Sequence, residues 1–167
     1  PEVPRDSVAI LALSVPAATP LASYLEVDIE GFRVLVDPAL TRTSELWRRT
    51  RAALLFDLGL VAERLPATAL EGVRQTPIVV TLSTPARPDW DGSSAACLHV
   101  SEGWLLSHGY DADRAGVVEI LHAEKYLLWR AEQPMMLLHE LAHAHHLALG
   151  YDEPRIGSAF EEATERG

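Results

Sequence analysis

The chain has 167 residues, of which 48% are hydrophobic and 23% are charged, and this length suits a single domain with a substantial core. Its net charge of −10 argues against a nucleic-acid-binding surface and against binding to an anionic membrane surface. No apolar run reaches the ~18 residues of a membrane span, and the single cysteine, Cys97, excludes an internal disulfide and a cysteine-based zinc site.

The N-terminal half predicts a hairpin, two helices and a strand. After an extended lead-in that contains the apolar run Val8–Val15, two segments alternate apolar and polar residues on either side of Glu30-Gly31, which is typical of a β-hairpin. Asp37-Pro38 ends the hairpin. A helix, a second short helix and a short buried strand are expected next, at Ser44–Leu65, Pro66–Arg74 and Pro77–Leu82.

The C-terminal half begins with a long loop, Ser83–Ala96, and loops of this length are usually functional or mobile. A brief extended piece is expected at His99. Then follow a helix with Ser101 as its N-cap, a strand and three more helices, at Ser101–His108, Gly116–Ile120, Ala123–Gln133, Pro134–Gly150 and Pro154–Arg166. This order predicts an α+β fold in which helices pack one small mixed sheet.

The most informative motif is His139-Glu140-Leu141-Ala142-His143, an H-E-x-x-H pattern inside the predicted helix Pro134–Gly150. Histidines four residues apart project from one face of a helix, so both imidazoles can bind one zinc ion. Glu140 follows the first histidine and can act as general base toward a water that zinc activates. The alternative is a polar surface stripe, but a capped, apolar helix has little other use for these side chains.

A catalytic zinc site takes three protein ligands, and the identity of the third is open. Glu162, with Glu161 as the next candidate, lies on the last predicted helix and closes the site if that helix folds back against the first. Both glutamates would otherwise form a solvated helix face. A third alternative places the ligand beyond Gly167, because the chain stops within a predicted helix.

Other polar residues are weaker candidates. His146 is excluded from the first coordination shell, because His139 to His146 spans ~10 Å of helix axis, and His145 points away from the pair. His99 closes the long loop and is a candidate substrate contact, although most such histidines are surface or capping residues. Glu119 is expected either to face a cleft or to lie on the wet face of an edge strand.

The block from Trp104 to Tyr151 carries a family resemblance. Its segments are Trp104-Leu105 with Gly109, Val118-Glu119-Ile120, Gln133-Pro134 and His139–His146. The block resembles poorly characterised bacterial and fungal zinc-metallopeptidase-like proteins, which are related through their H-E-x-x-H helix to the zincins and loosely to the catalytic domain of anthrax lethal factor. The resemblance implies a zincin-like α+β fold, bound Zn2+ and secretion, with a signal sequence absent from this chain.

The chain departs from this group in one respect, because it lacks the later segment resembling N-x-x-E-Y-F-A-E that would supply the third ligand. Either Glu161 or Glu162 substitutes, or the metallopeptidase-like domain 1–167 is incomplete. The favoured hypothesis is a zinc metallopeptidase that binds an extended peptide or protein substrate along Pro77–Leu82 or Gly116–Ile120. The alternatives are a zinc amidohydrolase of a non-peptide substrate and a non-catalytic binding domain that retains the fold.

Overall fold

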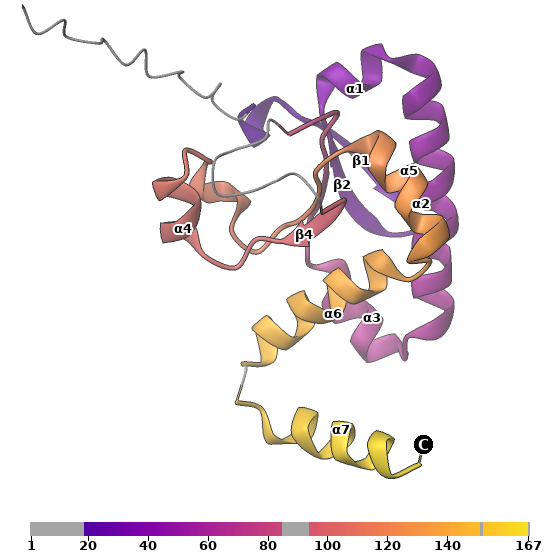
Figure 1. Cartoon of the computed structure of the whole chain (residues 1–167), viewed down its shortest axis with the longest axis vertical. Coiled ribbons are helices and arrows are strands. Elements are labelled where there is room, and N and C mark those ends of the chain that lie inside the picture. Colours follow the sequence, from indigo (N-terminus) through magenta and orange to yellow (C-terminus); the bar gives the residue numbers. More distant parts are fainter. Residues whose placement is uncertain (1–18, 85–93, 151, 167) are drawn as a thin grey trace, which may run out of the picture.

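The centre of the structure is a five-stranded mixed sheet with the strand order β1-β2-β3-β5-β4 (Figure 1). The computed structural model describes residues 19–84, 94–150 and 152–166, so the run Val8–Val15 lies outside the described residues. The strands are β1 Leu25–Ile29, β2 Phe32–Val36, β3 Ile78–Val80, β4 Ala96–Leu98 and β5 Val118–Ile120. The three inner strands run parallel, whereas β1 and β4 are antiparallel edges. The predicted α+β class is confirmed.

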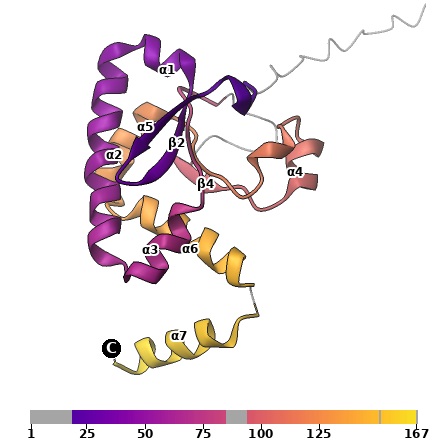
Figure 2. The same ribbon diagram turned by 180° about the vertical axis from the view of Figure 1, so that it is seen from behind.

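Helices cover the sheet unequally. The helices are α1 Pro38–Arg42, α2 Ser44–Arg64, α3 Ala67–Arg74, α4 Glu102–Ser107, α5 Ala123–Glu132, α6 Met136–Leu149 and α7 Pro154–Arg166, with the 3-10 turns η1 Leu21–Ser23 and η2 Ala112–Arg114. Core residues of α2, α3, α5 and α6 pack with one face of the sheet. Helix α4 lies on the opposite side of the sheet from α2 and α5, in the views from the front and from behind (Figures 1 and 2).

The predicted β-hairpin is confirmed, and its turn explains its register. Glu30 and Gly31 both have positive φ, 56° and 79°, as a two-residue type I′ turn requires. The turn aligns Ile29 with Phe32, and both side chains are buried in the core. Because strand side chains alternate between faces, this register also turns Val34 and Val36 toward the helices.

Asp37 does not simply end the hairpin, as the sequence suggested, but joins two elements. Its Oδ1 accepts a hydrogen bond from Ala39 N at 2.7 Å, which caps a short helix that the sequence did not predict, α1. Its Oδ2 accepts from Leu82 N at 3.2 Å, just after β3. One buried carboxylate therefore ties the end of β2 to the end of its parallel neighbour.

A second buried carboxylate, Asp57, fastens α2 to α5. Tyr126 donates its hydroxyl to Asp57 Oδ2 at 2.5 Å, and Arg130 forms an ion pair with the same carboxylate. Burial raises the pKa of Tyr126 well above its ordinary value, and the Asp57 charge adds to that effect. The polar contact fixes the angle of two helices whose contact is otherwise apolar and non-directional.

Most predicted elements are confirmed, and the differences are local. Helix α6 begins at Met136 and not at Pro134. Most of the loop predicted over Ser83–Ala96 lies outside the described residues, and its last residue, Ala96, pairs with β5. Among the described residues, no helix is both long enough and apolar enough to cross a membrane.

Candidate metal centre

Helix α6 is held by a buried stripe, and that stripe decides which side chains face outward. Its buried residues, spaced by one, three and four positions, are Met136, Leu137, Leu141 and Ala144. The helix ends as the sequence predicted, at Gly150, whose φ of 93° lies in a region that favours glycine. Since the apolar stripe faces the core, His139 and His143 lie on the exposed face one turn apart.

The two histidines converge on one point. His139 Nε2 and His143 Nε2 are 2.9 Å apart, and the two rings meet edge to face with an interplanar angle of 90°. Zinc binds imidazole nitrogen at about 2.0–2.1 Å, so two ligand nitrogens on one ion lie less than roughly 4 Å apart. The pair therefore fits as two ligands of a single divalent metal ion.

Glu140 lies between the helix and the edge of the sheet. Its Oε2 accepts a hydrogen bond from Leu98 N at 3.0 Å, so the carboxylate bridges α6 to β4. Burial raises the pKa of the Glu140 carboxyl above its ordinary value, against the opposing effects of the two nearby imidazoles and the Leu98 amide. The contact holds the carboxylate in one place next to the histidine pair.

A pocket of about 570 Å³ opens beside the motif. Its lining joins residues before β4, the end of α5 and the first turn of α6, and it includes Ser94, Ala96, Trp129, His139 and Glu140. The pocket gives a substrate-sized space that reaches both the first histidine and the carboxylate.

The strand next to this pocket is β4, which pairs with β5 alone among the described strands and is therefore an edge of the sheet. His99 N donates to Val117 O at 3.0 Å, and His99 O accepts from Gly116 N at 2.7 Å. The backbone N–H and C=O groups of His99 therefore face the β5 side. Antiparallel pairing alternates, so the N–H and C=O groups of Ala96 and Leu98 face away from β5, as the bond to Glu140 also indicates.

This arrangement corrects the expected peptide-binding strand. The sequence pointed to Pro77–Leu82 or Gly116–Ile120, but the strands in these segments, β3 and β5, are both interior to the sheet. Their backbone groups on both sides pair with neighbouring strands, so neither can accept an added strand. Only a sheet edge offers that, and β4 is the edge that borders the motif.

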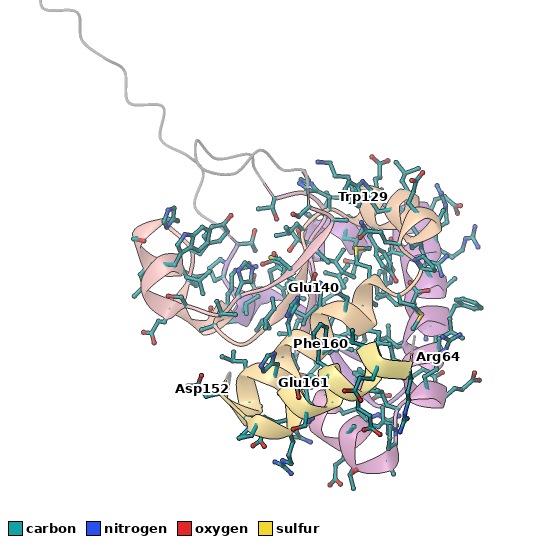
Figure 3. All side chains as sticks on the ribbon, turned by 60° about the horizontal axis from the view of Figure 1, so that its bottom comes forward. Arg64, Trp129, Glu140, Asp152, Phe160 and Glu161 are labelled. Carbon is teal, nitrogen blue, oxygen red and sulfur yellow. The ribbon has the colours of Figure 1, made fainter. Side chains whose placement is uncertain are left out.

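The proposed third ligands are not joined to the histidine pair in this structure. Glu161 and Glu162 lie on α7, which runs back beneath α6 and has no buried residue (Figures 1 and 3). Glu162 forms an ion pair with Arg166 on its own helix. Across residues 19–84, 94–150 and 152–166, no three His, Cys, Asp or Glu side chains are grouped to hold a metal ion.

The other histidines of α6 lie as helical geometry predicts. His145 faces α3, where a Cβ added to Gly72 would come within 3.4 Å of its Nδ1. His146 is half-buried, seven residues after His139. Among the described residues, the fit to a metal therefore depends on the two imidazoles of His139 and His143.

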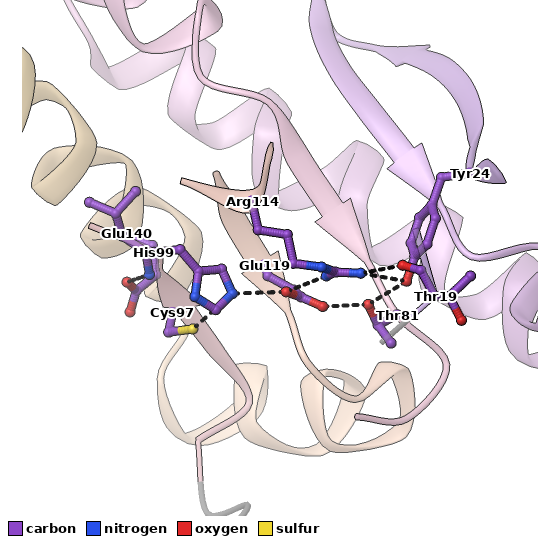
Figure 4. A network of polar contacts seen from close by, with 9 residues as sticks. Thr19, Tyr24, Thr81, Cys97, His99, Arg114, Glu119 and Glu140 are labelled. Carbon is purple, nitrogen blue, oxygen red and sulfur yellow. Dashed lines mark hydrogen bonds and ion pairs between the residues drawn. The ribbon is translucent and has the colours of Figure 1, made fainter. Parts of the chain in front are cut away.

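A buried polar network lies on the other face of the sheet (Figure 4). Glu119 is 1% exposed, and its Oε2 accepts from His99 Nε2 at 2.8 Å and pairs with Arg114 Nη1 at 2.6 Å. Its Oε1 accepts from the Thr81 hydroxyl at 2.6 Å, and Tyr24 OH lies 3.2 Å from that hydroxyl. Both expectations for Glu119 are wrong, since it lies on neither a cleft surface nor an edge strand.

Charge compensation explains why Glu119 can be buried. Burial by itself would raise the pKa of Glu119, but the hydrogen bond from His99 and the charge of Arg114 outweigh it, so that the pKa lies below its ordinary value. Arg114 is 2% exposed and also donates to Thr19 O at 2.8 Å and to Tyr24 OH at 3.3 Å. The network ties β5 to β3, β4 and the segment around η1.

The sequence did not point to Arg114, and it suggested His99 as a substrate contact without its bond to Glu119. Arg114 stands in a polar stretch, Asp111–Arg114, that reads like any exposed turn. Glu119 inside the apolar segment Val117–Leu121 was the available signal, because a carboxylate buried in a strand needs a cationic partner. Nothing in the sequence identifies which of the fourteen basic residues supplies it.

Cys97 lies between these two clusters. The side chain is half-buried, and its Sγ is 3.9 Å from His99 Nε2. Burial raises the pKa of the Cys97 thiol to about 12, and the charges of Glu119 and Glu140 add to that shift. A thiol whose pKa is raised in this way behaves as a small, weakly polar group in the packing.

Comparisons with protein-family models, with curated proteins and with solved structures found no match. The resemblance to zinc-metallopeptidase-like proteins therefore stays a prediction that depends on the residues named for it.

Proposed function

We propose that this chain is a zinc-dependent hydrolase with a zincin-like fold, and within that class a metallopeptidase. The observation that supports this best is the convergence of His139 Nε2 and His143 Nε2 to 2.9 Å beside a carboxylate held at a sheet edge. A polar surface stripe would not require the carboxylate to reach across to β4. The resemblance of the Trp104–Tyr151 block adds to this proposal.

Each polar residue of the motif has its own role in this proposal. His139 and His143 hold the ion, which when bound supplies Lewis-acid polarisation of the scissile carbonyl and lowers the pKa of water to about 7. Glu140 keeps Oε2 on Leu98 N and uses Oε1 to take the proton of the attacking water. The same carboxylate then delivers that proton to the leaving amine. A third ligand, Glu162 or Glu161, completes the site if α7 moves toward α6.

The substrate in this proposal is an extended peptide. The outward N–H and C=O groups of Ala96 can pair with a peptide backbone, as in other cases of strand addition. The next outward amide of β4, at Leu98, is bound to Glu140. A peptide paired with Ala96 would therefore pass close to the Glu140 carboxylate. Strand addition therefore brings a peptide bond within reach of the proposed base.

The test combines metal content with turnover. We expect the purified chain to bind one equivalent of zinc by elemental analysis and to cleave members of a mixed peptide library, detected by mass spectrometry. Glu140→Gln should lower kcat/KM by about 10²–10⁴-fold and leave zinc bound, since it removes the base and neither imidazole. Glu63→Gln, on the exposed side of α2, is the matched control and should retain full activity.

Each alternative has its own outcome. A chain that binds no zinc at saturating concentration rules out the hydrolase proposal. Bound zinc without cleavage of peptides or of small amides would indicate the non-catalytic binding domain. Cleavage of small amides alone would indicate the amidohydrolase, and activity that is unchanged in Glu140→Gln would remove this residue from the mechanism.

A further inference from the structure

A second pocket lies on the sheet face opposite α6, between β4 and α4. It has a volume of about 550 Å³, and the residues that matter to its chemistry are Cys97, Leu98, His99, Trp104, Leu105 and Tyr110. The strand register explains the face. Cys97 pairs with Glu119, whose side chain points away from the helix-side core that contains Val118 and Ile120.

The floor of this pocket is polar, but its charge is already compensated. The His99 ring is held by Glu119 at 2.8 Å, and Glu119 is paired with Arg114 at 2.6 Å. A charged ligand group would therefore find no unpaired counter-charge among these residues. The His99 ring, held by this hydrogen bond, offers the pocket a flat surface.

The walls are aromatic and fixed in place. Trp104 is 44% exposed, stacks on His108 with ring centroids 4.2 Å apart, and lies 6.0 Å from Tyr110 at an interplanar angle of 20°. The Ser101 hydroxyl caps α4 by accepting from Trp104 N at 3.2 Å, which fixes the backbone that carries the indole. Flat, nearly parallel ring faces suit an aromatic guest, because offset stacking adds to apolar burial.

The pocket is continuous with the edge that the proposed substrate would use. Ser94 lines both pockets, and Leu98, whose amide binds Glu140, lines this one. Side chains of an extended peptide alternate between the two faces of a sheet, so a strand added to β4 turns every second side chain toward this face. The two pockets thus lie on opposite sides of one peptide backbone.

We propose that this second pocket binds a large aromatic side chain of an extended peptide paired with β4, and so selects the substrate. The inference rests on the proposed function for the peptide, whereas the pocket itself can be tested without any turnover. Trp104 is the specificity-determining residue. The His99 ring, held in place by Glu119, forms the floor of the pocket.

The first experiment measures binding alone. N-acetyl-L-phenylalaninamide is titrated into ¹⁵N-labelled Glu140→Gln protein, with N-acetyl-L-alaninamide as the matched probe. We expect the phenylalanine probe to shift the Trp104 indole signal and the Val100 and Ser101 amides, with at least tenfold weaker binding in Trp104→Ala. Phe56→Ala removes an exposed ring from α2, outside this pocket, and should leave probe affinity unchanged. Absence of shifts at these positions overturns the inference.

The second experiment measures cleavage of a peptide in which each position in turn is Phe or Ala. We expect Phe to raise kcat/KM about tenfold or more over Ala at one position, and Trp104→Ala to bring this Phe-to-Ala ratio close to one. Cleavage with no aromatic preference would overturn the pocket and keep the proposed function. Probe binding without cleavage of any peptide would keep the pocket and remove the proposed function.

Discussion

The two polar clusters of this protein, the exposed pair His139 and His143 and the buried group around Glu119, lie on opposite sides of β4 and differ in what they leave available. The imidazoles of the pair have mainly each other and solvent. Both Glu119 oxygens are bound, by Arg114, His99 and Thr81. Hydrogen-bond satisfaction therefore separates a candidate ligand-binding group from a structural one better than residue type does, since histidine occurs in both clusters.

The largest expected effect comes from removing the central carboxylate of the buried cluster. Glu119→Ala leaves Arg114 buried without its partner and should reduce the free energy of unfolding by about 3–5 kcal/mol, measured by urea denaturation. His139→Ala, assayed in zinc-free buffer, should change it by less than about 0.5 kcal/mol because the side chain is exposed. Equal losses in the two variants would contradict the division into structural and ligand-binding clusters.

Zinc should narrow the difference in stability between the Glu119→Ala and His139→Ala variants. At a free zinc concentration about 100 times the Kd, binding to the folded state adds about 2.7 kcal/mol to the free energy of unfolding, which thermal denaturation detects as a higher Tm. His139→Ala and His143→Ala should each lose that gain. His145→Ala is the control on the same helix, because its side chain faces Gly72, and it should keep the gain. A gain that survives both ligand substitutions would place the zinc elsewhere.

The next largest expected effect is the loss of stability that acid causes through the buried cluster. Because the folded-state pKa of Glu119 is lowered from the ordinary 4.5, the unfolded chain takes up this proton first as the pH falls. The stability that Glu119 contributes is therefore present above pH 4.5 and is lost below it, by at most about 1.4 kcal/mol per pH unit. Urea denaturation at several pH values should show a weaker acid dependence in Glu119→Gln than in the original chain.

The smallest expected effect concerns the third ligand. With Glu162 exposed and paired to Arg166, the arrangement in this structure predicts that Glu162→Gln changes zinc affinity by less than about threefold. Glu161→Gln is the neighbouring comparison, and isothermal titration calorimetry measures both. A loss of tenfold or more in either variant would identify that residue as a ligand and require α7 to pack against α6 when metal is bound.

Helix α7 is the one element whose place the sequence suggested and the packing does not support. Its bounds match the expected Pro154–Arg166, because helix formation depends on local residues. Its apolar side chains remain uncovered, and Phe160 is 72% exposed (Figure 3). Helix propensity predicts that a segment forms a helix, but the surface against which that helix packs depends on other parts of the chain.

The elements themselves were largely predictable. Alternation on either side of Glu30-Gly31 indicated the hairpin, three- and four-residue steps indicated α2, and the spacing of His139 and His143 placed two side chains on one helix face. All three are periodicities within a few turns or strands, so neighbouring residues determine them.

Local patterns were enough to predict the helix that carries the candidate site and the placement of His139 and His143 on one of its faces, because a four-residue spacing is close to one helical turn. The folded chain was needed to show that β4 is the sheet edge beside the motif, that Glu140 bonds to Leu98, and that Arg114 neutralises Glu119. Those contacts join segments far apart in the chain. Strand order and the pairing of buried charges minimise the energy of the whole fold, and no local pattern encodes them.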